Sequence, residues 1–271
     1  MHQNYSLEKL VTSQYLDHEI LAKRKTFHRL EDPYIYLPDE IFKRLNTQKS
    51  QAILDIGCGN GDILVYLAEH GIKGIYTGID ISPGMLKEAE INAQKADTPM
   101  TFVVANAEML PFSDASFDAV TAKFSLHCVE NIPRAINEIY RVLKPGGKFV
   151  IVCRSNRSQK DFDEFRKKLA EKFGLRIIPN MSSRFTLETL PDLVKNFYKK
   201  EFASIETVIR ITEPELFVDY LSTYRTHFEP TPSEKTWTKI LEMARAEIQK
   251  IILEHGEYAE TIVHGVTLCT K

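Results

Sequence analysis

Three glycines, Gly57, Gly59 and Gly61, stand at every second position after an apolar run that contains the carboxylate of Asp55. Glycine has no Cβ, so such a turn bends sharply and lets a ligand approach the main chain. The stretch that follows, residues 62–69, predicts a helix with unpaired N–H groups at its start. Strand, glycine turn and helix are typical of the opening of a nucleotide-binding α/β unit, although glycine turns also serve ordinary strand–helix packing.

A second carboxylate, Asp80, follows Gly61 by 19 residues. Nucleotide-binding folds place an acid for the ribose hydroxyls at about this spacing. Asp55, Asp80, Asn106 and Lys123 all map near the carboxyl ends of predicted strands. In a parallel sheet those ends share one edge, and ligands bind there. Four polar residues at four strand ends are stronger evidence for a ligand site than the glycine pattern alone.

The elements that must position these residues alternate between strand and helix from residue 51 onward. We expect strands at residues 52–56, 74–81, 100–105, 117–124 and 148–153, with helices between them. Such alternation predicts parallel strands with right-handed crossovers and helices on both faces. Two later strands, at 204–211 and 258–269, would complete a doubly wound, mostly parallel seven-stranded α/β sheet.

The remaining segments are predicted to be mainly helical. Residues 1–50 form an N-terminal helical segment and a candidate lid, with apolar spacing over 7–21, an irregular stretch at 34–36 and a helix at 39–45. The basic cluster at 23–29 has a simpler alternative, a solvated helix face. Later helices are expected at 161–173, 186–198 and 213–224, and after a capping box at 231–234, as insertions at about 159–200 and 213–256.

Composition excludes several classes of protein. The chain has 271 residues, 43% apolar and 27% charged, which is ordinary for a soluble globular protein. A net charge of −2 gives no reason to expect a nucleic-acid partner, although a local basic patch could exist within a neutral total. The four scattered cysteines predict reduced thiols and no metal site. Without a leader or a long apolar run, we expect a cytoplasmic protein that does not enter a membrane.

Five segments, in order along the chain, resemble the class I S-adenosylmethionine-dependent methyltransferases. Residues 53–61 resemble motif I, and the third glycine comes one residue too early for the dinucleotide pattern of a nicotinamide dehydrogenase. The other four are the ribose segment Gly78–Ser82, the adenine segment Asn106–Phe112, the fourth strand Phe117–Val120 and the turn Arg141–Gly147. The helical segment before motif I and the long tail are similar to the small-molecule, UbiE-like branch.

This resemblance implies a Rossmann-like methyltransferase domain over 51–271 and S-adenosylmethionine as cofactor, with S-adenosylhomocysteine as product. The implied cofactor-binding residues are Asp55, Gly57, Gly59, Asp80, Ile81, Asn106, Ala107, Glu108 and Lys123. Asp80 would accept both ribose hydroxyls, because a carboxylate has lone pairs for two donors. Asp55 would attract the ammonium group or would only cap the turn. Lys123 would touch the methionine end or point to solvent, and Glu108 would line adenine or stabilise a helix N-terminus.

Methyl transfer from a sulfonium is an in-line displacement, so a base is needed only where the nucleophile keeps its proton. His127, just after the fourth strand, and His28, in the N-terminal segment, are the candidate catalytic residues. A structural role in its loop is an equal alternative for His127. Candidate substrate-binding residues are Arg24, Tyr34, Arg154 and Tyr220, for which a surface or core role is the alternative.

The predicted function is therefore methyl transfer to O or N of a small-molecule acceptor. An RNA-modifying methyltransferase and a non-catalytic protein that binds S-adenosylmethionine remain as alternatives. A gel shift with tRNA would favour the former, and product formation would exclude the latter. The sequence leaves open whether the protein is a monomer or a dimer.

Overall fold

The computed structural model describes residues 18–46, 51–94, 96 and 98–271, so the apolar positions expected to be helical before residue 18 lie outside the described residues. The chain divides into two compact units. The sheet unit comprises residues 36–156, 181–205 and 264–271, and the helical unit comprises residues up to 35, 157–180 and 206–263. The expected N-terminal segment is thus shared between them, since residues 36–46 belong to the sheet unit. Its action as a lid stays a prediction.

Parallel strands form the centre of the sheet unit, as predicted. Neighbouring strands pair in parallel in the order β6-β5-β2-β3-β4. Their bounds are Gln51–Ile56 (β2), Gly74–Asp80 (β3), Met100–Val104 (β4), Phe117–Lys123 (β5) and Leu143–Arg154 (β6). On the other side of β6 lies the antiparallel strand β10, Tyr258–Thr270, and then β8, Lys199–Ile211. The predicted fold class is confirmed.

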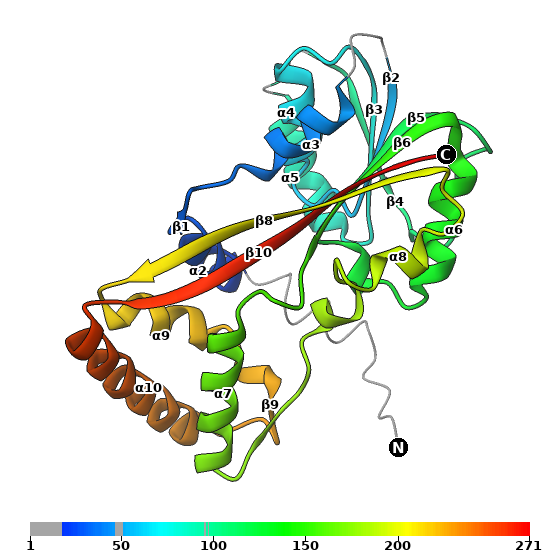
Figure 1. Ribbon diagram of the computed structural model, residues 1–271. Helices are drawn as coiled ribbons and strands as arrows, with labels where there is room; N and C mark the ends of the chain where they lie inside the picture. The colour runs from blue at the N-terminus through cyan, green and yellow to red at the C-terminus, as the bar shows by residue number, and fades with distance from the viewer. Residues whose placement is uncertain (1–17, 47–50, 95, 97) are drawn as a thin grey trace. The chain divides into compact units, whose positions relative to one another are not determined.

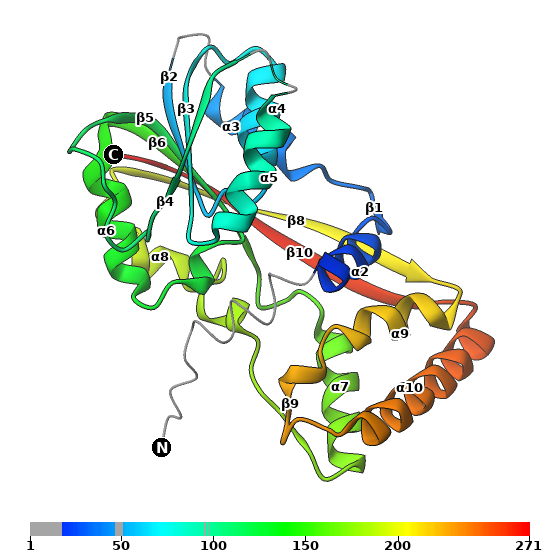
Figure 2. The same ribbon diagram turned by 180° about the vertical axis from the view of Figure 1, so that it is seen from behind.

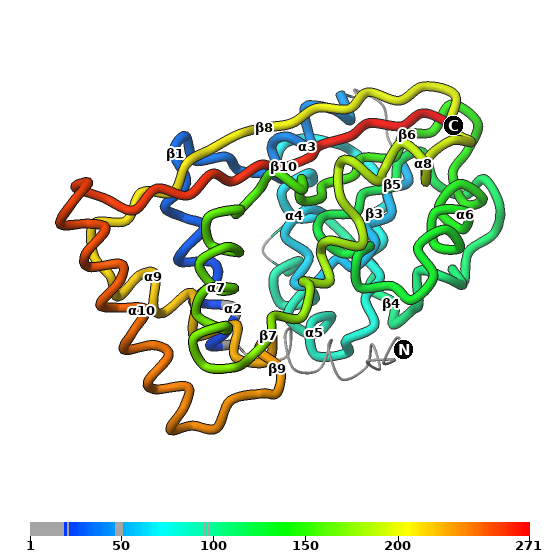
Figure 3. The backbone as a smooth tube through the Cα atoms, turned by 60° about the horizontal axis from the view of Figure 1, so that its bottom comes forward, coloured from blue at the N-terminus to red at the C-terminus, as the bar shows by residue number. Residues whose placement is uncertain are grey.

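Among the described residues the sheet has eight strands rather than seven. The additional strand, β1, is only Glu31–Asp32, and it pairs antiparallel with Val208 and Ile209 of β8. Two residues carry too little alternation to be recognised in a sequence. Figure 3 shows β8 and β10 as long runs of chain, and each contributes residues to both units.

Alternating side chains along the strands pack against helices on both faces of the sheet. Ile53 packs with buried residues of α3 (Leu37–Leu45) and α4 (Asp62–Glu69). The next residue, Leu54, packs with residues of α6 (Ile132–Val142) and α8 (Leu190–Leu193). Figure 1 shows α3, α4 and α5 (Pro83–Ala93) on one side of these strands and α6 and α8 on the other. This double coverage is what the continuous apolar strands require.

Side chains and glycines define where these helices begin. Ser82 is the N-cap of α5, where its Oγ accepts a hydrogen bond from the N–H of Met85, as predicted. Asn131 caps α6 through its Oδ1, which accepts from the N–H of Arg134. Gly61, in the left-handed region with φ 77°, is the N-cap of α4.

The helical unit has its own aromatic core. It contains α2 (His18–His28), α7 (Lys160–Lys172), α9 (Pro214–Ser222) and α10 (Glu234–His255), seen together in Figure 2. Two strands of two residues each, Arg176–Ile177 (β7) and Phe228–Glu229 (β9), pair antiparallel with one another. The buried side chains include Phe27, Phe162, Phe217, Tyr220 and Trp237, which come from four different helices. Aromatic side chains bury large areas and so dominate a core of this size.

Two local predictions were wrong. Residues 186–198 form only the short helix α8, because Thr186 bridges to Arg154 and the N–H of Leu187 donates to the Arg154 carbonyl. Strand-type pairing there competes with helix formation. The capping box was also misplaced: α10 begins at Glu234, and Ser233 rather than Thr231 is the N-cap, accepting from the N–H of Thr236.

All four cysteines are free; three of them are buried and Cys128 is half-buried, so they lie in or near the core, as expected. In the described part of the chain, no helix combines the length and the apolar character needed to cross a membrane.

Candidate cofactor site

The strand order identifies one edge of the sheet unit as a ligand site. From β2 the chain adds β3 and β4 on one side, and then returns to place β5 on the other side of β2. Ligands of such sheets bind outside the carboxyl ends of the strands at this reversal point. The glycine turn follows β2 and Ser125 follows β5, and the Ser125 hydroxyl donates to the carbonyl of Ile56 at 2.6 Å.

The glycine turn has a conformation that other residues rarely adopt. Gly57 and Gly59 have φ values of 66° and 53°, in the left-handed region. A Cβ on Gly57 would lie 2.4 Å from the Cβ of Ser125, whereas a Cβ on Gly59 would meet only the Met85 methyl at 3.5 Å. Gly57 is therefore required by its close packing, and the backbone at Gly59 is open to a ligand.

Asp80 joins the end of β3 to the glycine turn. Its Oδ2 accepts a hydrogen bond from the N–H of Gly59 at 3.0 Å, and its Oδ1 accepts from the N–H of Ser82 at 2.9 Å. Both oxygens keep a further lone pair, so the carboxylate can accept two more donors. The backbone thus holds this carboxylate in a fixed orientation, as the binding of two adjacent hydroxyls requires.

Asp55 is fully buried beneath the turn. Its Oδ1 accepts from the Thr121 hydroxyl of β5 at 2.7 Å, while Oδ2 has no hydrogen-bond partner among the described residues. Burial raises the pKa of Asp55 to about 7, and the Thr121 hydrogen bond offsets this only in part. Within the described chain neither oxygen of Asp55 forms a hydrogen bond with the glycine turn. The structure therefore gives no support to the alternative that Asp55 only caps the turn. An unpaired buried oxygen fits a donor on a ligand, such as an ammonium group.

Lys123 does not point freely into solvent. Its Nζ forms an ion pair with Oδ2 of Asp62, the first residue of α4. The pair links the end of β5 to the helix that follows the glycine turn. A direct contact of Lys123 with the cofactor stays a prediction.

The expected adenine segment is organised by its own side chains. Asn106 Oδ1 accepts from the N–H of Glu108 at 2.8 Å. Glu108 Oε1 in turn accepts from the N–H groups of Glu130 and Asn131 at the start of α6. Glu108 therefore holds the segment that leads into α6; it is not a first-turn acid of a helix, because it lies in a turn, and its contact with the cofactor stays a prediction. Ile81 is 52% exposed and Ala107 is buried, so of the two only Ile81 presents an open apolar face.

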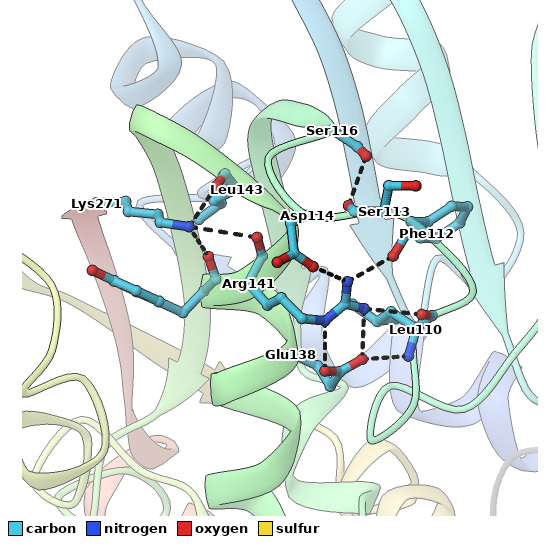
Figure 4. A network of polar contacts seen from close by, with 10 residues as sticks. Leu110, Phe112, Ser113, Asp114, Ser116, Glu138, Arg141, Leu143 and Lys271 are labelled. Carbon is cyan, nitrogen blue, oxygen red and sulfur yellow. Dashed lines mark hydrogen bonds and ion pairs between the residues drawn. The ribbon is translucent and has the colours of Figure 1, made fainter.

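Arg141 is a structural residue of the site that sequence reasoning did not single out. Figure 4 shows its guanidinium at the centre of the loop that continues the adenine segment. It donates to the carbonyls of Leu110 and Phe112 and pairs with Asp114 and Glu138. Glu138 also accepts from the N–H of Leu110 at 2.8 Å. The available signal was the position of Arg141 at the start of the Arg141–Gly147 segment.

His127 lies in the short helix η1 (Leu126–Cys128) and is buried. Burial, with a smaller contribution from Arg184, lowers the pKa of His127 to about 4. The imidazole is therefore neutral near pH 7, and it is a weak base. Arg184 donates to the carbonyls of His127 and Glu130, which ties the loop together. These contacts favour the structural alternative, and a catalytic role stays a prediction.

The helical unit brings together three other predicted residues. Arg24 donates to the Oγ1 and carbonyl of Thr223, and His28 Nδ1 lies 2.8 Å from a carboxylate oxygen of Glu31. The Tyr220 ring stands edge-on to His28, with centroids 5.9 Å apart. Two predicted substrate residues are not part of this group: Tyr34 of the helical unit is exposed after β1, and Arg154 ends β6 in the sheet unit.

Comparison with known proteins agrees with this geometry. Residues 54–151 match the family model described as "Methyltransferase domain". This part of the chain is therefore similar to methyltransferase domains. It contains the glycine turn, Asp55 and Asp80, and its family implies S-adenosylmethionine as cofactor. The chain fits that group: Asp80 offers acceptors for hydroxyls, and Asp55 offers an unpaired oxygen for an ammonium group.

Relatives of the methyltransferase domain are matched over about half of their own length. A sterol 4-C-methyltransferase of Caenorhabditis elegans is 32% identical over 174 residues, 61% of this chain and 51% of that protein. A demethylmenaquinone methyltransferase of Symbiobacterium thermophilum is 40% identical over 116 residues, 42% of this chain and 45% of that protein. A solved structure described as a putative methyltransferase of Bacillus halodurans has a TM-score of 0.58 at 17% identity, with 86% of this chain and 98% of that chain covered. The structural likeness supports the fold.

Proposed function

We propose that this chain is a methyltransferase that transfers the methyl group of S-adenosylmethionine to O or N of a small-molecule acceptor by direct in-line displacement. The observation that carries the proposal is the edge where the glycine turn, the backbone-held carboxylate of Asp80 and the unpaired oxygen of Asp55 meet. It lies within the part of the chain that matches the methyltransferase domain. The relatives are named for a sterol and a menaquinone precursor, both small molecules, which supports this acceptor class over RNA.

When bound, the cofactor would supply a methyl group attached to a positively charged sulfur; as the methyl group is transferred, its bond to sulfur breaks and the sulfur leaves as a neutral thioether. The chain contributes orientation. Asp80 would accept the ribose hydroxyls and Asp55 the ammonium group, while the open backbone at Gly59 allows close approach. Holding the reacting atoms in line contributes about 7–11 kcal/mol in well-oriented systems. Burial raises the pKa of the Asp55 carboxyl to about 7. An ammonium group bound beside it would lower this pKa, because a nearby cation favours the charged form of a carboxyl group.

The acceptor residues and the base stay proposals. Arg24, Tyr34, Arg154 and Tyr220 are the candidates for binding the acceptor. His28 is the more suitable candidate base, since the pKa of His127 is about 4. We further propose that residues 1–50 act as a lid and that the protein works in the cytoplasm. The name of the sterol relative specifies transfer to carbon, so transfer to carbon is a second candidate reaction.

Calorimetry with the Asp80→Ala variant tests the cofactor assignment. Loss of charge-assisted hydrogen bonds should weaken S-adenosylmethionine binding by about 1.5–3 kcal/mol. Asp192→Ala is the matched control, because Asp192 is an exposed carboxylate on α8 of the same unit. Unchanged affinity in Asp80→Ala would refute the ribose assignment. Failure to form S-adenosylhomocysteine with any acceptor, despite cofactor binding, would favour the non-catalytic alternative.

A further inference from the structure

The interior of the helical unit contains a buried arginine with unused donors. Arg166 of α7 is 2% exposed. Its Nη2 donates to Oδ1 of Asp163, but Nε and Nη1 are buried and have no hydrogen-bond acceptor among the described residues. A buried charged donor without a partner is costly, so proteins rarely keep one without a use.

A pair of tyrosine hydroxyls beside Arg166 adds another unused donor. Gln159 Nε2 donates to the Tyr220 hydroxyl at 2.7 Å, and that hydroxyl lies 2.8 Å from the hydroxyl of Tyr224. Only one of the two tyrosine hydroxyls can donate its hydrogen to the other. The hydrogen of the second hydroxyl therefore has no acceptor in the described chain. Burial raises the pKa of Tyr220 well above its ordinary value, so its hydroxyl keeps its proton.

These donors gather around one aromatic ring. The guanidinium carbon of Arg166 lies 4.6 Å from the ring centroid of Tyr224, and that of Arg24 lies 5.1 Å from the same centroid. Rings of Phe162, Tyr220 and His227 pack around Tyr224 at centroid distances of 5.0–5.2 Å. The cluster thus combines cationic donors with aromatic rings.

The charge balance of this cluster indicates the ligand. Arg24 and Arg166 contribute two positive charges, and Asp163 pairs with Arg166. Burial, together with Arg166 and Arg24, lowers the pKa of His227 to about 3, so His227 is neutral. Within the described chain Arg24 bonds Thr223 and forms no ion pair with a carboxylate. Among these four groups one positive charge is left over, beside the unused donors and the aromatic rings.

We propose that this cluster binds the carboxylate of a small molecule whose body is apolar or aromatic. A carboxylate accepts hydrogen bonds only, carries one negative charge and matches the planar guanidinium of Arg166. A phosphate dianion would bring a second negative charge that the cluster does not balance. Binding of this carboxylate does not rest on the proposed function.

Binding is tested with the full chain in the absence of cofactor, with sodium benzoate as the probe and benzamide as its neutral analogue. Benzoate should bind and raise the melting temperature, and benzamide should not. Arg166→Met should weaken benzoate binding about tenfold to a hundredfold, the equivalent of losing one charged hydrogen bond. Tyr224→Phe should weaken it by a smaller factor, because it removes a neutral hydroxyl.

Arg245→Met is the control, since Arg245 of the same unit forms an exposed ion pair with Glu215. It should leave benzoate binding unchanged. The melting temperature of ligand-free Arg166→Met, measured alongside, shows how far loss of the Arg166–Asp163 ion pair destabilises the fold, and Tyr224→Phe, which keeps that pair, tests the site independently.

Three results would overturn the proposal: no binding of benzoate by the wild-type chain, benzoate binding that survives Arg166→Met, or tighter Arg166-dependent binding of inorganic phosphate than of benzoate. S-Adenosylmethionine titrated into the same samples separates the two proposals. Cofactor binding without benzoate binding refutes only the carboxylate site, and the reverse result refutes only the proposed function.

Discussion

The two units of this chain build their polar sites in different ways. In the sheet unit, Asp80 accepts N–H groups from the adjacent turn and from Ser82, two residues along the chain. In the helical unit, Arg166 and Tyr224 come from separate segments, and several of their donors have no acceptor within the described chain. Parallel strands bring their carboxyl ends to a shared edge, so the residues at the ends of neighbouring strands form the site. The helical unit depends on packing between segments that are distant in the sequence. Its site consists of the hydrogen-bond donors of Arg166 and of the tyrosine pair that have no acceptor after this packing.

The largest expected effect concerns the glycine turn, which packs closely against the residue that follows β5. Gly57→Ala combines a left-handed φ with a Cβ only 2.4 Å from the Cβ of Ser125, and it should cost about 2–5 kcal/mol of stability and abolish cofactor binding. Gly71→Ala is the control, because Gly71 has φ 86° but no neighbour within 4 Å of a Cβ. It should cost only about 1–2 kcal/mol. Equal losses in chemical denaturation would contradict the packing argument.

A smaller effect should distinguish the buried carboxyls of the two units. Burial raises the pKa of Asp55 and of Glu260 to about 7. The folded state therefore keeps these protons at pH values where the unfolded state, with ordinary pKa values of 3.8 and 4.5, has lost them. The contribution of each carboxyl to stability is fully present below about pH 4 and is lost as the pH rises through about 7.

Asp55→Asn and Glu260→Gln should each remove part of this decline, on the order of 2–3 kcal/mol between pH 5 and pH 8. Urea denaturation of wild type and variants at the two pH values measures it. Only Asp55→Asn should also weaken S-adenosylmethionine binding, since Glu260 lies in the helical unit, where its Oε2 accepts from the N–H of Phe162 and the hydroxyl of Tyr258. Equal effects of the two variants on cofactor binding would remove the proposed distinction between the units.

The smallest effect concerns the loop held by Arg141. Arg141→Met should lower stability by about 1–3 kcal/mol and weaken cofactor binding modestly, because two carbonyls and two carboxylates lose their donor. Arg134→Met, at an exposed position of the same helix, is the control. Hydrogen exchange should increase over residues 110–114 in the first variant alone. Unchanged exchange there would show that the loop is held by other contacts.

Residues 51–153 could be interpreted from the sequence because each signal was local. The strand pattern, the spacing from Gly61 to Asp80 and the N-cap at Ser82 all depend on neighbours within one strand–helix unit. The cofactor family followed from five such segments. In contrast, the helix expected at 186–198 was wrong because Arg154, far away in sequence, pairs with Thr186. The strand β1 was missed because its pairing with β8 joins residues 31–32 to residues 208–209.

The sequence by itself determined the sheet, its glycine turn and the cofactor family, since these depend on backbone periodicity and on residues close together in the chain. Only the tertiary structure decided that Asp55 is buried with an unpaired oxygen, that His127 is held neutral by burial, and that Arg141 supports the adenine segment. It also decided that Arg166 and Tyr224 share a donor-rich interior. Burial and hydrogen-bond saturation depend on which distant residues pack together, and a linear pattern of residue types does not contain that information.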